Sequence, residues 1–394
     1  MSSTELGIDL LKAKTKEFIG SREVKTGVLC HPASVTKAFE HIVLILEKAT
    51  KLTTFFGPQH GIYGETQDNM IEWEDLKDSQ GRPIYSLYGK TRVPSDQSLR
   101  EVQLMVIDLF DVGSRYYTFQ YTMAYMMEVC AKLGIPVIVC DRPNPLGGEL
   151  IEGPILDSRF RSFVGRYEIP VCHGMTIGEL AFLFAEKMSP KPKIKIVPMK
   201  GWRRRMFWPD TKLVWTLPSP NMPNFEAALL YPGMCLLEAS TLSEGRGTTR
   251  PFELIGAPFF EWDKIEREYQ KLCRSLQLLP VTFHRQGFIP TFHKFAGQIC
   301  RGALQISPNP LKFKPLRHAV TLLWIFRQLY GRDWDWTSPP YEYEFEKKPI
   351  DILMGGTETR EVIDSGGSLK QLYRQWANDE KKFRRTRLPF LRYR

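Results

Sequence analysis

The chain of 394 residues lacks the short motifs that mark several large enzyme classes. It contains no G-x-G-x-x-G after its first predicted strand, no G-x4-G-K-[ST], no H-E-x-x-H and no C-x-x-C. These absences disfavour a dinucleotide-dependent enzyme, a P-loop nucleotidase and a zinc protease. The G-x-S-x-G turn that carries the serine of α/β-hydrolases is missing as well.

The sequence also has no apolar run close to the roughly 20 residues of a membrane span. Its N-terminus carries Glu5 and Asp9 where a signal peptide needs an uninterrupted apolar stretch. The seven cysteines are odd in number and have no paired spacing, which is not the pattern of a disulfide framework. We therefore expect a cytoplasmic protein that does not associate with membranes.

Acidic residues are fewer than basic ones, and the formal net charge is +10. Much of this excess lies in two short segments, residues 203–205 and 381–387. A nucleic-acid-binding protein needs its basic surface joined to a recognisable module, and no zinc-finger, RRM or KH signature is present. A solvated basic surface is the simpler interpretation, so no nucleic-acid partner is expected.

The first half of the chain alternates apolar strands with amphipathic helices. Apolar strands in this arrangement predict a parallel sheet that is covered on both faces. The predicted strands are residues 25–31, 52–56, 104–109, 135–140 and 194–199, and the predicted helices are residues 35–49, 121–133 and 176–188, the last with Thr176 as its N-cap.

The pattern changes near residue 217, where a proline-rich stretch is typical of a crossover between domains. Beyond it we expect helices at residues 262–276 and 315–330 and strands at residues 281–288 and 292–304. The sequence therefore predicts an α/β fold, with a parallel-sheet domain over residues 1–222 and a smaller α+β domain over residues 223–394.

Three loops at the ends of predicted strands carry ionisable side chains. Because parallel strands point the same way, these loops meet at one edge of the sheet. Carboxylates gathered there with amides, a histidine and aromatic rings predict a hydrolase-like cleft. Taken singly, each side chain has a simpler structural explanation, such as capping a helix or neutralising a neighbour. The loops contain Gln59, His60 and Glu65; then Asp108, Asp111, Arg115 and Tyr116; then Asp141, Asn144, Glu149 and Glu152.

The second half contributes one more polar loop, residues 235–258. Glu238, Glu244 and Arg246 lie there among glycines, and their carboxylates could belong to the same cleft. The structural alternative is a glycine turn with Glu244 and Arg246 as an exposed ion pair, which would contribute little to stability.

A set of segments, in order along nearly the whole chain, resembles the NamZ-type exo-β-N-acetylmuramidase family. Several motifs at matching spacing are far more specific than any one of them. The segments are FGPQHG, DVGSRYYTF, DRPNPLGG-x4-EGP, PSPNMP, YPGMCLLE, LSEGRGTTRPFELIGAP, PPYEYE and KKPIDILMGG.

This resemblance implies a Rossmann-like N-terminal domain, a smaller C-terminal domain and an active site in the cleft between them. It also implies hydrolysis of terminal N-acetylmuramic acid from peptidoglycan fragments without a nicotinamide cofactor, so we expect no cofactor and no metal. The chain departs from the family at two positions. Gln59 stands where muramidases of the family carry the proposed catalytic glutamate, and His31 stands where they usually have asparagine. An amide cannot act as a general acid or a carboxylate nucleophile.

Three hypotheses follow, and the oligomeric state stays open in all of them. The first is a glycosidase acting on a small muropeptide or another amino-sugar glycoside, with Glu65, Glu152 and Glu244 as its catalytic carboxyl groups. The second is a non-catalytic muropeptide-binding or sugar-binding protein that has lost the family's carboxylate. The third and weakest is DNA binding through the basic tail. The expected substrate-binding residues are His31, Gln59, His60, Asp108, Arg115, Tyr116, Asp141, Asn144, Glu238 and Arg246.

Overall fold

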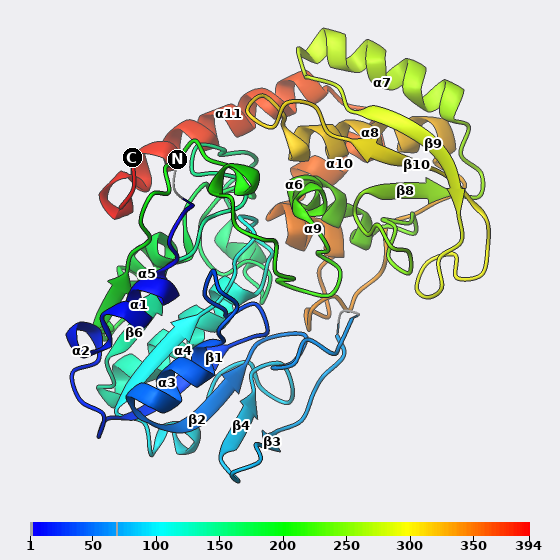
Figure 1. The fold of residues 1–394 in the computed structure, drawn as a ribbon. Coiled ribbons are helices and arrows are strands. Elements are labelled where there is room, and N and C mark those ends of the chain that lie inside the picture. The colour runs from blue at the N-terminus through cyan, green and yellow to red at the C-terminus, as the bar shows by residue number, and fades with distance from the viewer. Residues whose placement is uncertain (1–2, 68–69) are drawn as a thin grey trace.

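A computed structural model describes residues 3–67 and 70–394 of the chain. The first part is built on a seven-stranded sheet in the order β3-β4-β2-β1-β5-β6-β7 (Figure 1). All neighbouring strands are parallel except β3, which runs antiparallel to β4. The strands are β1 (Lys25–Cys30), β2 (Lys51–Gly57), β3 (Leu76–Lys77), β4 (Pro83–Ser86), β5 (Leu104–Asp108), β6 (Val137–Cys140) and β7 (Ile194–Val197).

Helices cover both faces of this sheet, as the apolar strands predict. Alternate residues of β5 show the two faces, because Val106 packs in one hydrophobic cluster while Met105 and Ile107 pack in the other. The first face is covered by α1 (Gly7–Ala13) and α3 (Ile42–Ala49), and the second by α4 (Phe119–Leu133) and α5 (Ile177–Ala185). The α/β prediction with a parallel sheet is confirmed.

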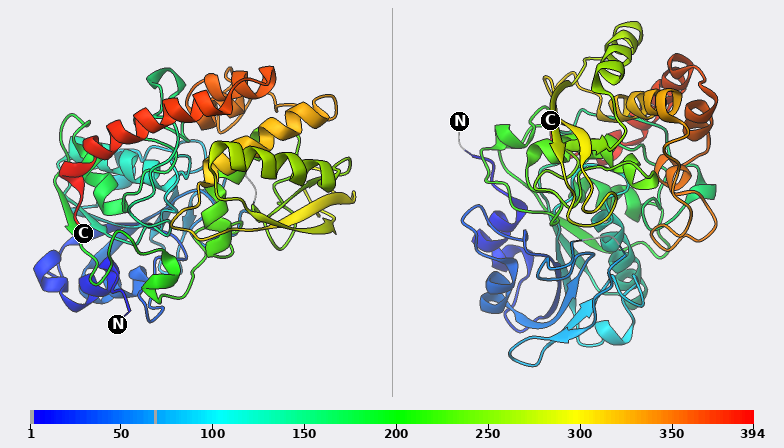
Figure 2. Two further views of the ribbon diagram at one scale, coloured as in Figure 1. Left: turned by 90° about the horizontal axis from the view of Figure 1, so that it is seen from above. Right: turned by 90° about the vertical axis from the view of Figure 1, so that its right-hand side faces the viewer.

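The second part holds an antiparallel sheet of three strands in the order β8-β10-β9 (Figure 2). Helix α7 packs on this sheet, since Trp262 and Tyr269 contact the ring of Phe283 on β9. The elements of this part are α6 (Phe225–Met234), β8 (Leu254–Ala257), α7 (Trp262–Leu276), β9 (Thr282–Phe288), β10 (Cys300–Ile306), α8 (Pro315–Tyr330), α9 (Pro349–Met354), α10 (Glu358–Ser365) and α11 (Leu369–Thr386). The predicted boundary between residues 222 and 223 stays a prediction.

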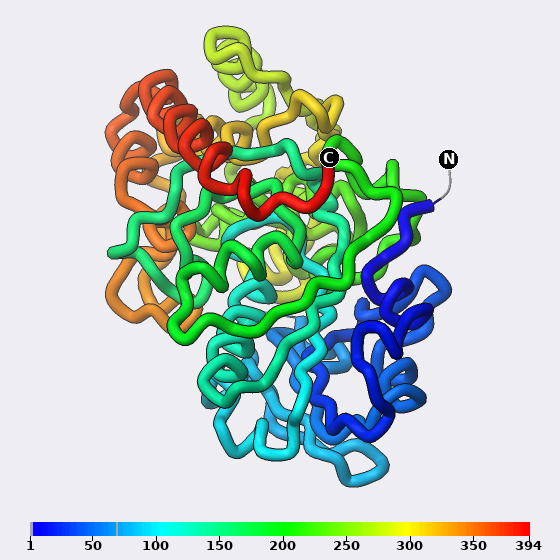
Figure 3. The backbone as a smooth tube through the Cα atoms, turned by 90° about the vertical axis from the view of Figure 1, so that its left-hand side faces the viewer, coloured from blue at the N-terminus to red at the C-terminus, as the bar shows by residue number. Residues whose placement is uncertain are grey.

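Helix α11 leads the chain back to the first sheet (Figure 3). Asp379 and Glu380 accept hydrogen bonds from the backbone N–H groups of Ile155 and Gly153. Beyond the helix, Tyr393 donates a 2.6 Å hydrogen bond to Asp141. The short elements that complete the fold are α2 (Thr15–Phe18) and the 3₁₀ turns η1 (Gln97–Leu99), η2 (Ser158–Phe160), η3 (Trp208–Thr211), η4 (Cys235–Ala239) and η5 (Leu388–Phe390). None of the helices in the described ranges is long and apolar enough to cross a membrane.

Two predicted elements were wrong in part. The helix expected from residue 35 begins only at Ile42, because Val35 and His41 form an isolated bridge and Phe39 has a left-handed backbone. The strand expected from residue 292 begins at Cys300, because positive φ angles at His293 and Phe295 turn the chain before it. Thr176 is confirmed as an N-cap, and its hydroxyl accepts the N–H of Glu179.

Candidate active site

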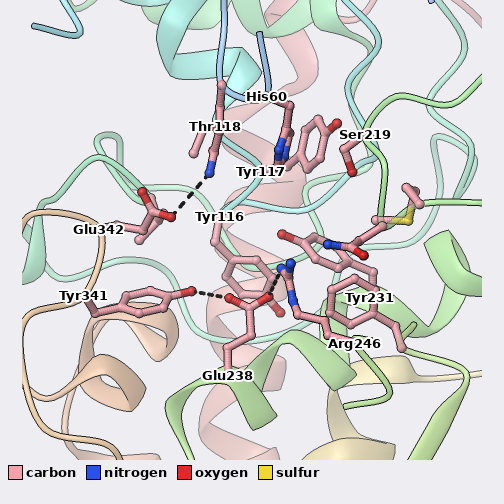
Figure 4. Close-up of a pocket in the computed structure, with 15 residues that line it drawn as sticks. His60, Tyr116, Tyr117, Thr118, Ser219, Tyr231, Glu238, Arg246, Tyr341 and Glu342 are labelled. Carbon is pink, nitrogen blue, oxygen red and sulfur yellow. Dashed lines mark hydrogen bonds and ion pairs between the residues drawn. The ribbon is translucent and has the colours of Figure 1, made fainter. Parts of the chain in front are cut away.

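A pocket lies between the carboxyl end of the parallel sheet and the second part of the chain (Figure 4). It encloses about 440 Å³, counting the space that is open to solvent. Its residues come from the loops after β2 and β5, the loop between η2 and α5, helix α6 and the loop before it, the η4 turn, the loop before β8 and the segment between α8 and α9. They are Gln59, His60, Tyr116, Tyr117, Thr118, Val164, Ser219, Asn221, Met222, Tyr231, Glu238, Arg246, Phe252, Tyr341 and Glu342.

Glu342 is one of two carboxyl groups that line the pocket among the residues that the structure describes. It is only 3% exposed and sits at a positive φ angle of 45° in the segment before α9. Tyr88 donates a 2.9 Å hydrogen bond to its Oε2, and the amide of Gln59 lies 3.4 Å from its Oε1. Burial raises the pKa of Glu342 to about 7 and the nearby charge of Glu238 acts in the same direction, while the two hydrogen bonds oppose the rise. This carboxyl group can therefore hold a proton near neutral pH.

Glu238 is the second carboxyl group and has a different environment. Figure 4 shows it between Arg246 and Tyr341. Arg246 Nη2 lies 2.7 Å from one carboxylate oxygen, and the Tyr341 hydroxyl donates to the other at 2.8 Å. Burial acts to raise the pKa of Glu238, but the charge and hydrogen bond of Arg246 outweigh it, and the net pKa lies below the usual range. Glu238 is therefore ionised.

Aromatic rings make up much of the remaining wall. Tyr231 contacts the rings of Tyr116, Tyr117 and Phe252 edge to face. The hydroxyls of Tyr116 and Tyr117 donate to the carbonyls of Pro232 and Pro218, which fixes both rings. Rigid aromatic faces beside polar groups suit a ligand that has both apolar and hydroxyl-bearing surfaces, such as a sugar.

Gln59 and His60 reach the pocket from the loop that follows β2. Thr118 donates a 2.7 Å hydrogen bond to Gln59 Oε1, so the Gln59 amide nitrogen points towards Glu342. His60 has a φ angle of 73°, and its Nδ1 lies 2.8 Å from the carbonyl oxygen of Thr66. Both side chains are held by contacts within the loop and across the pocket.

Of the residues expected at the site, Gln59, His60, Tyr116, Glu238 and Arg246 line the pocket. The remaining expected binding residues have partners elsewhere. His31 accepts the N–H of Phe110, Asp108 forms a buried bidentate ion pair with Arg142, and Arg115 donates to the carbonyls of Pro154, Ile169 and Leu353. Asp141 accepts from Thr176, Gly178 and Tyr393, and Asn144 bonds Met175 and Leu146.

The three glutamates expected to be catalytic do not line the pocket. Glu65 is exposed and lies against Gly61 in the same loop as Gln59. Glu152 lies in the loop after β6 and is fully buried beside the start of α8, where it accepts the N–H groups of Leu316 and Arg317. Glu244 lies behind Arg246 and is bound by Lys294 at 2.8 Å. Glu152 and Glu244 thus have structural partners, and the pocket takes its carboxyl groups from Glu238 and Glu342.

Glu342 and Tyr341 are among the pocket residues that were not predicted from the sequence. They lie in the segment PPYEYE, where two glutamates alternate with tyrosines. Carboxyl groups next to tyrosines in a loop that follows two prolines could have indicated a ligand site. The local sequence, however, does not distinguish Glu342 from Glu344. Among the described residues, no group of three His, Cys, Asp or Glu side chains is arranged to hold a metal ion.

Two family models together match almost the whole chain. The N-terminal model of exo-β-N-acetylmuramidase NamZ matches residues 26–226 and the C-terminal model matches residues 229–393. The chain is 40% identical to the peptidoglycan β-N-acetylmuramidase NamZ of Bacillus subtilis over 391 residues, which is 99% of this chain and 91% of that protein.

Two crystal structures of DUF1343 family proteins from Bacteroides fragilis have the same fold. The first has a TM-score of 0.85 at 29% identity and the second a TM-score of 0.75 at 26% identity. In both comparisons all of this chain and 99% of the other chain are covered.

Proposed function

The chain belongs to the exo-β-N-acetylmuramidase NamZ family, and we propose that it hydrolyses N-acetylmuramic acid glycosides in peptidoglycan fragments or a related amino-sugar glycoside. The observation that carries this proposal is the pair of pocket carboxyl groups, Glu342 and Glu238, whose environments move their pKa values in opposite directions. In glycosidases, different environments around two carboxyl groups keep one of them protonated as the general acid and the other ionised as the carboxylate.

In this proposal Glu342 is the general acid. With a pKa of about 7 a substantial fraction of Glu342 carries its proton at neutral pH, and this proton can pass to the oxygen of the leaving sugar as the glycosidic bond breaks. Glu238 stays ionised beside Arg246 and faces the positive charge that develops on the sugar ring. Water then supplies the new oxygen on the sugar carbon, and Glu342, which has given up its proton, takes up the proton that the water loses. Tyr341 contacts both carboxyl residues. Its hydroxyl donates a hydrogen bond to Glu238, and Glu342 is the next residue in the sequence.

The proposal also gives Gln59 a function. Its amide nitrogen lies 3.4 Å from Glu342 Oε1, so a residue that cannot supply a proton helps to orient the one that does. The departure at residue 59 is then compatible with hydrolysis, since the pocket keeps two carboxyl groups. For the same reason a non-catalytic binding protein is the less favoured alternative.

A glycosidase assay with matched variants tests this function. Purified protein is incubated with a chromogenic β-N-acetylmuramide and with muramic acid-glucosamine disaccharides. Glu342→Gln should lower kcat by about 10²–10⁴-fold, the usual contribution of general acid catalysis. Glu346→Gln changes an exposed glutamate of the same segment and should keep the wild-type rate. Equal rates for wild type and Glu342→Gln, or no release above a heat-killed control, would contradict the proposal.

We also propose a cytoplasmic location for the protein. All seven cysteines lie in the described ranges, and each one is a buried free thiol. Free thiols persist in a reducing compartment. Cell fractionation with an antibody against the native protein would test this, and recovery from the medium or the cell envelope would contradict it.

A further inference from the structure

A second pocket, which shares no lining residue with the candidate active site, is rich in positive charge. It encloses about 580 Å³, counting the part open to solvent. It lies where the loops after β6 and after β7 meet the segment that leads into α8 and the end of α11. Arg204, Arg205, Lys314 and Arg384 line it, together with a single carboxylate, Glu149. Within the described part of the chain, four cations thus face one anion in this space.

The inner wall of the pocket is built to hold guanidinium groups. Arg204 is 8% exposed, pairs with Glu179 at 2.7 Å and donates to the carbonyls of Gly148 and Gly174. Arg387, only 4% exposed, donates to the same two carbonyls from behind. The glycines are needed because a Cβ on Gly148 would lie 2.9 Å from the guanidinium of Arg204.

Positive charge in this wall exceeds the negative charge that neutralises it. The Nε atoms of Arg204 and Arg387 are buried and have no acceptor among the described residues. Burial and the charges of Arg204 and Arg384 lower the pKa of Arg387 to about 9. An anion in the pocket would relieve this repulsion.

The outer wall has donors to offer. Arg205 and Arg384 are exposed and Lys314 is half-buried. Within residues 3–67 and 70–394 none of these three side chains makes a hydrogen bond or an ion pair. Arginine presents a planar set of N–H donors that matches the oxygens of phosphate and carboxylate groups, and lysine adds a point charge.

We propose that this second pocket is a binding site for a small molecule carrying an oxyanion, a phosphate or carboxylate group, which Arg205, Lys314 and Arg384 hold at the mouth while Arg204 supplies positive charge from the wall. The site is separate from the pocket of the glycosidase proposal, and it stands on its own observations.

Anion titrations with two charge-matched triple variants test this site. One variant, Arg205→Gln/Lys314→Gln/Arg384→Gln, removes the free cations of the pocket. The other, Arg203→Gln/Lys312→Gln/Arg385→Gln, removes three exposed cations nearby and the same net charge. Inorganic phosphate, methyl phosphate and acetate are titrated into each protein at constant ionic strength, with chloride as reference, and Kd and Tm are measured.

We expect at least one of these anions to bind the wild type, with affinity falling about tenfold or more in the pocket variant and less than about twofold in the control. Preference for the phosphates or for acetate identifies the anion, and either supports the site. No binding above chloride, or equal losses in both triple variants, would overturn it. Arg384→Glu, a single exposed change, gives the same test if the triple variant does not fold.

Discussion

The Tyr88 hydroxyl donates a 2.9 Å hydrogen bond to Glu342 Oε2 across 254 positions of the chain. Tyr88 follows β4 of the first sheet, whereas Glu342 belongs to the segment between α8 and α9. The contact therefore ties the proposed acid to the domain that supplies Gln59 and His60. It also opposes the rise in the pKa of Glu342, because a donor favours the charged carboxylate.

Tyr88→Phe should raise the pKa of Glu342 further and move the alkaline limb of the pH-rate profile upwards by about one unit. The estimate follows from the roughly 1.5 kcal/mol of a hydrogen bond to a charged group. Steady-state rates from pH 5 to pH 10 check it. Tyr85→Phe is the control, since Tyr85 stacks on Phe56 and its hydroxyl makes no hydrogen bond among the described residues. An unchanged limb in Tyr88→Phe would show that another group sets it.

Glu238→Gln should move the same limb in the opposite direction. The negative charge of Glu238 helps to raise the pKa of Glu342, so its removal lowers that pKa. The rate itself should fall by about 10²-fold or more, because the site loses the charge that stabilises the transition state. Glu244→Gln, which changes a carboxylate outside the pocket, should reduce kcat much less. A larger loss of kcat in Glu244→Gln than in Glu238→Gln would mean that Glu244, and not Glu238, is the carboxylate that stabilises the transition state.

Much of the fold follows from local patterns in the sequence. The helices over residues 262–276 and 315–330 begin and end where the apolar spacing predicts. The parallel strands were recognisable because both faces are buried, which makes their sequences continuously apolar. The segment before His41 was misread, since its apolar residues fit a helical period although the chain forms a bridge there.

The site was less predictable because its key partners are distant in sequence. Gln59 and Glu342 are 283 positions apart, and no local pattern states that their side chains meet. Strand-end polar residues were expected to face a ligand, but Asp108 is neutralised by Arg142 and Asp141 caps α5 through the N–H of Gly178. The parallel strands bring these side chains to one edge of the sheet. Their position alone does not show which of them are free of structural partners and can bind a ligand.

Glu152→Gln should cost stability and leave catalysis intact. The carboxylate is fully buried, accepts two N–H groups at the start of α8 and pairs with Arg317 at 3.2 Å. Arg317 keeps Glu380 as a partner at 2.8 Å, so the loss in the free energy of unfolding should be about 1–3 kcal/mol, the cost of weakening the hydrogen bonds of buried polar groups. Urea denaturation and kcat at 25 °C measure the two effects. A large loss of kcat at unchanged stability would return Glu152 to the catalytic group.

Gln59→Glu should couple two carboxyl groups and raise the second apparent pKa of the pair. A carboxylate at residue 59 would face Glu342 Oε1 at about the distance of the present amide, 3.4 Å. Like charges that close share one proton, so the alkaline limb of the pH-rate profile should move to higher pH. Gln80→Glu changes an exposed glutamine in the turn before β4, outside the pocket lining, and serves as the control. Identical profiles for wild type and Gln59→Glu would mean that residue 59 does not contact the acid.

Glu342→Gln should raise the free energy of unfolding relative to the wild type, and this difference should grow as the pH rises. The folded-state pKa of Glu342 is about 7, whereas an unfolded glutamate titrates near pH 4.3. The folded chain therefore binds the proton more tightly between these values, and the native state loses stability as the pH rises through this window. Gln carries no such penalty because it stays neutral.

The stability gain of Glu342→Gln over wild type should grow by on the order of 2 kcal/mol between pH 5 and pH 8, since each unit of pKa shift corresponds to about 1.4 kcal/mol. Urea denaturation at both pH values measures it, with Glu346→Gln as the exposed control that should show no such trend. A gain that is the same at both pH values would mean that Glu342 is already ionised at pH 5. Glu342 could not then be the acid of the proposed mechanism, because a carboxyl group that is ionised at pH 5 has no proton to give near neutral pH.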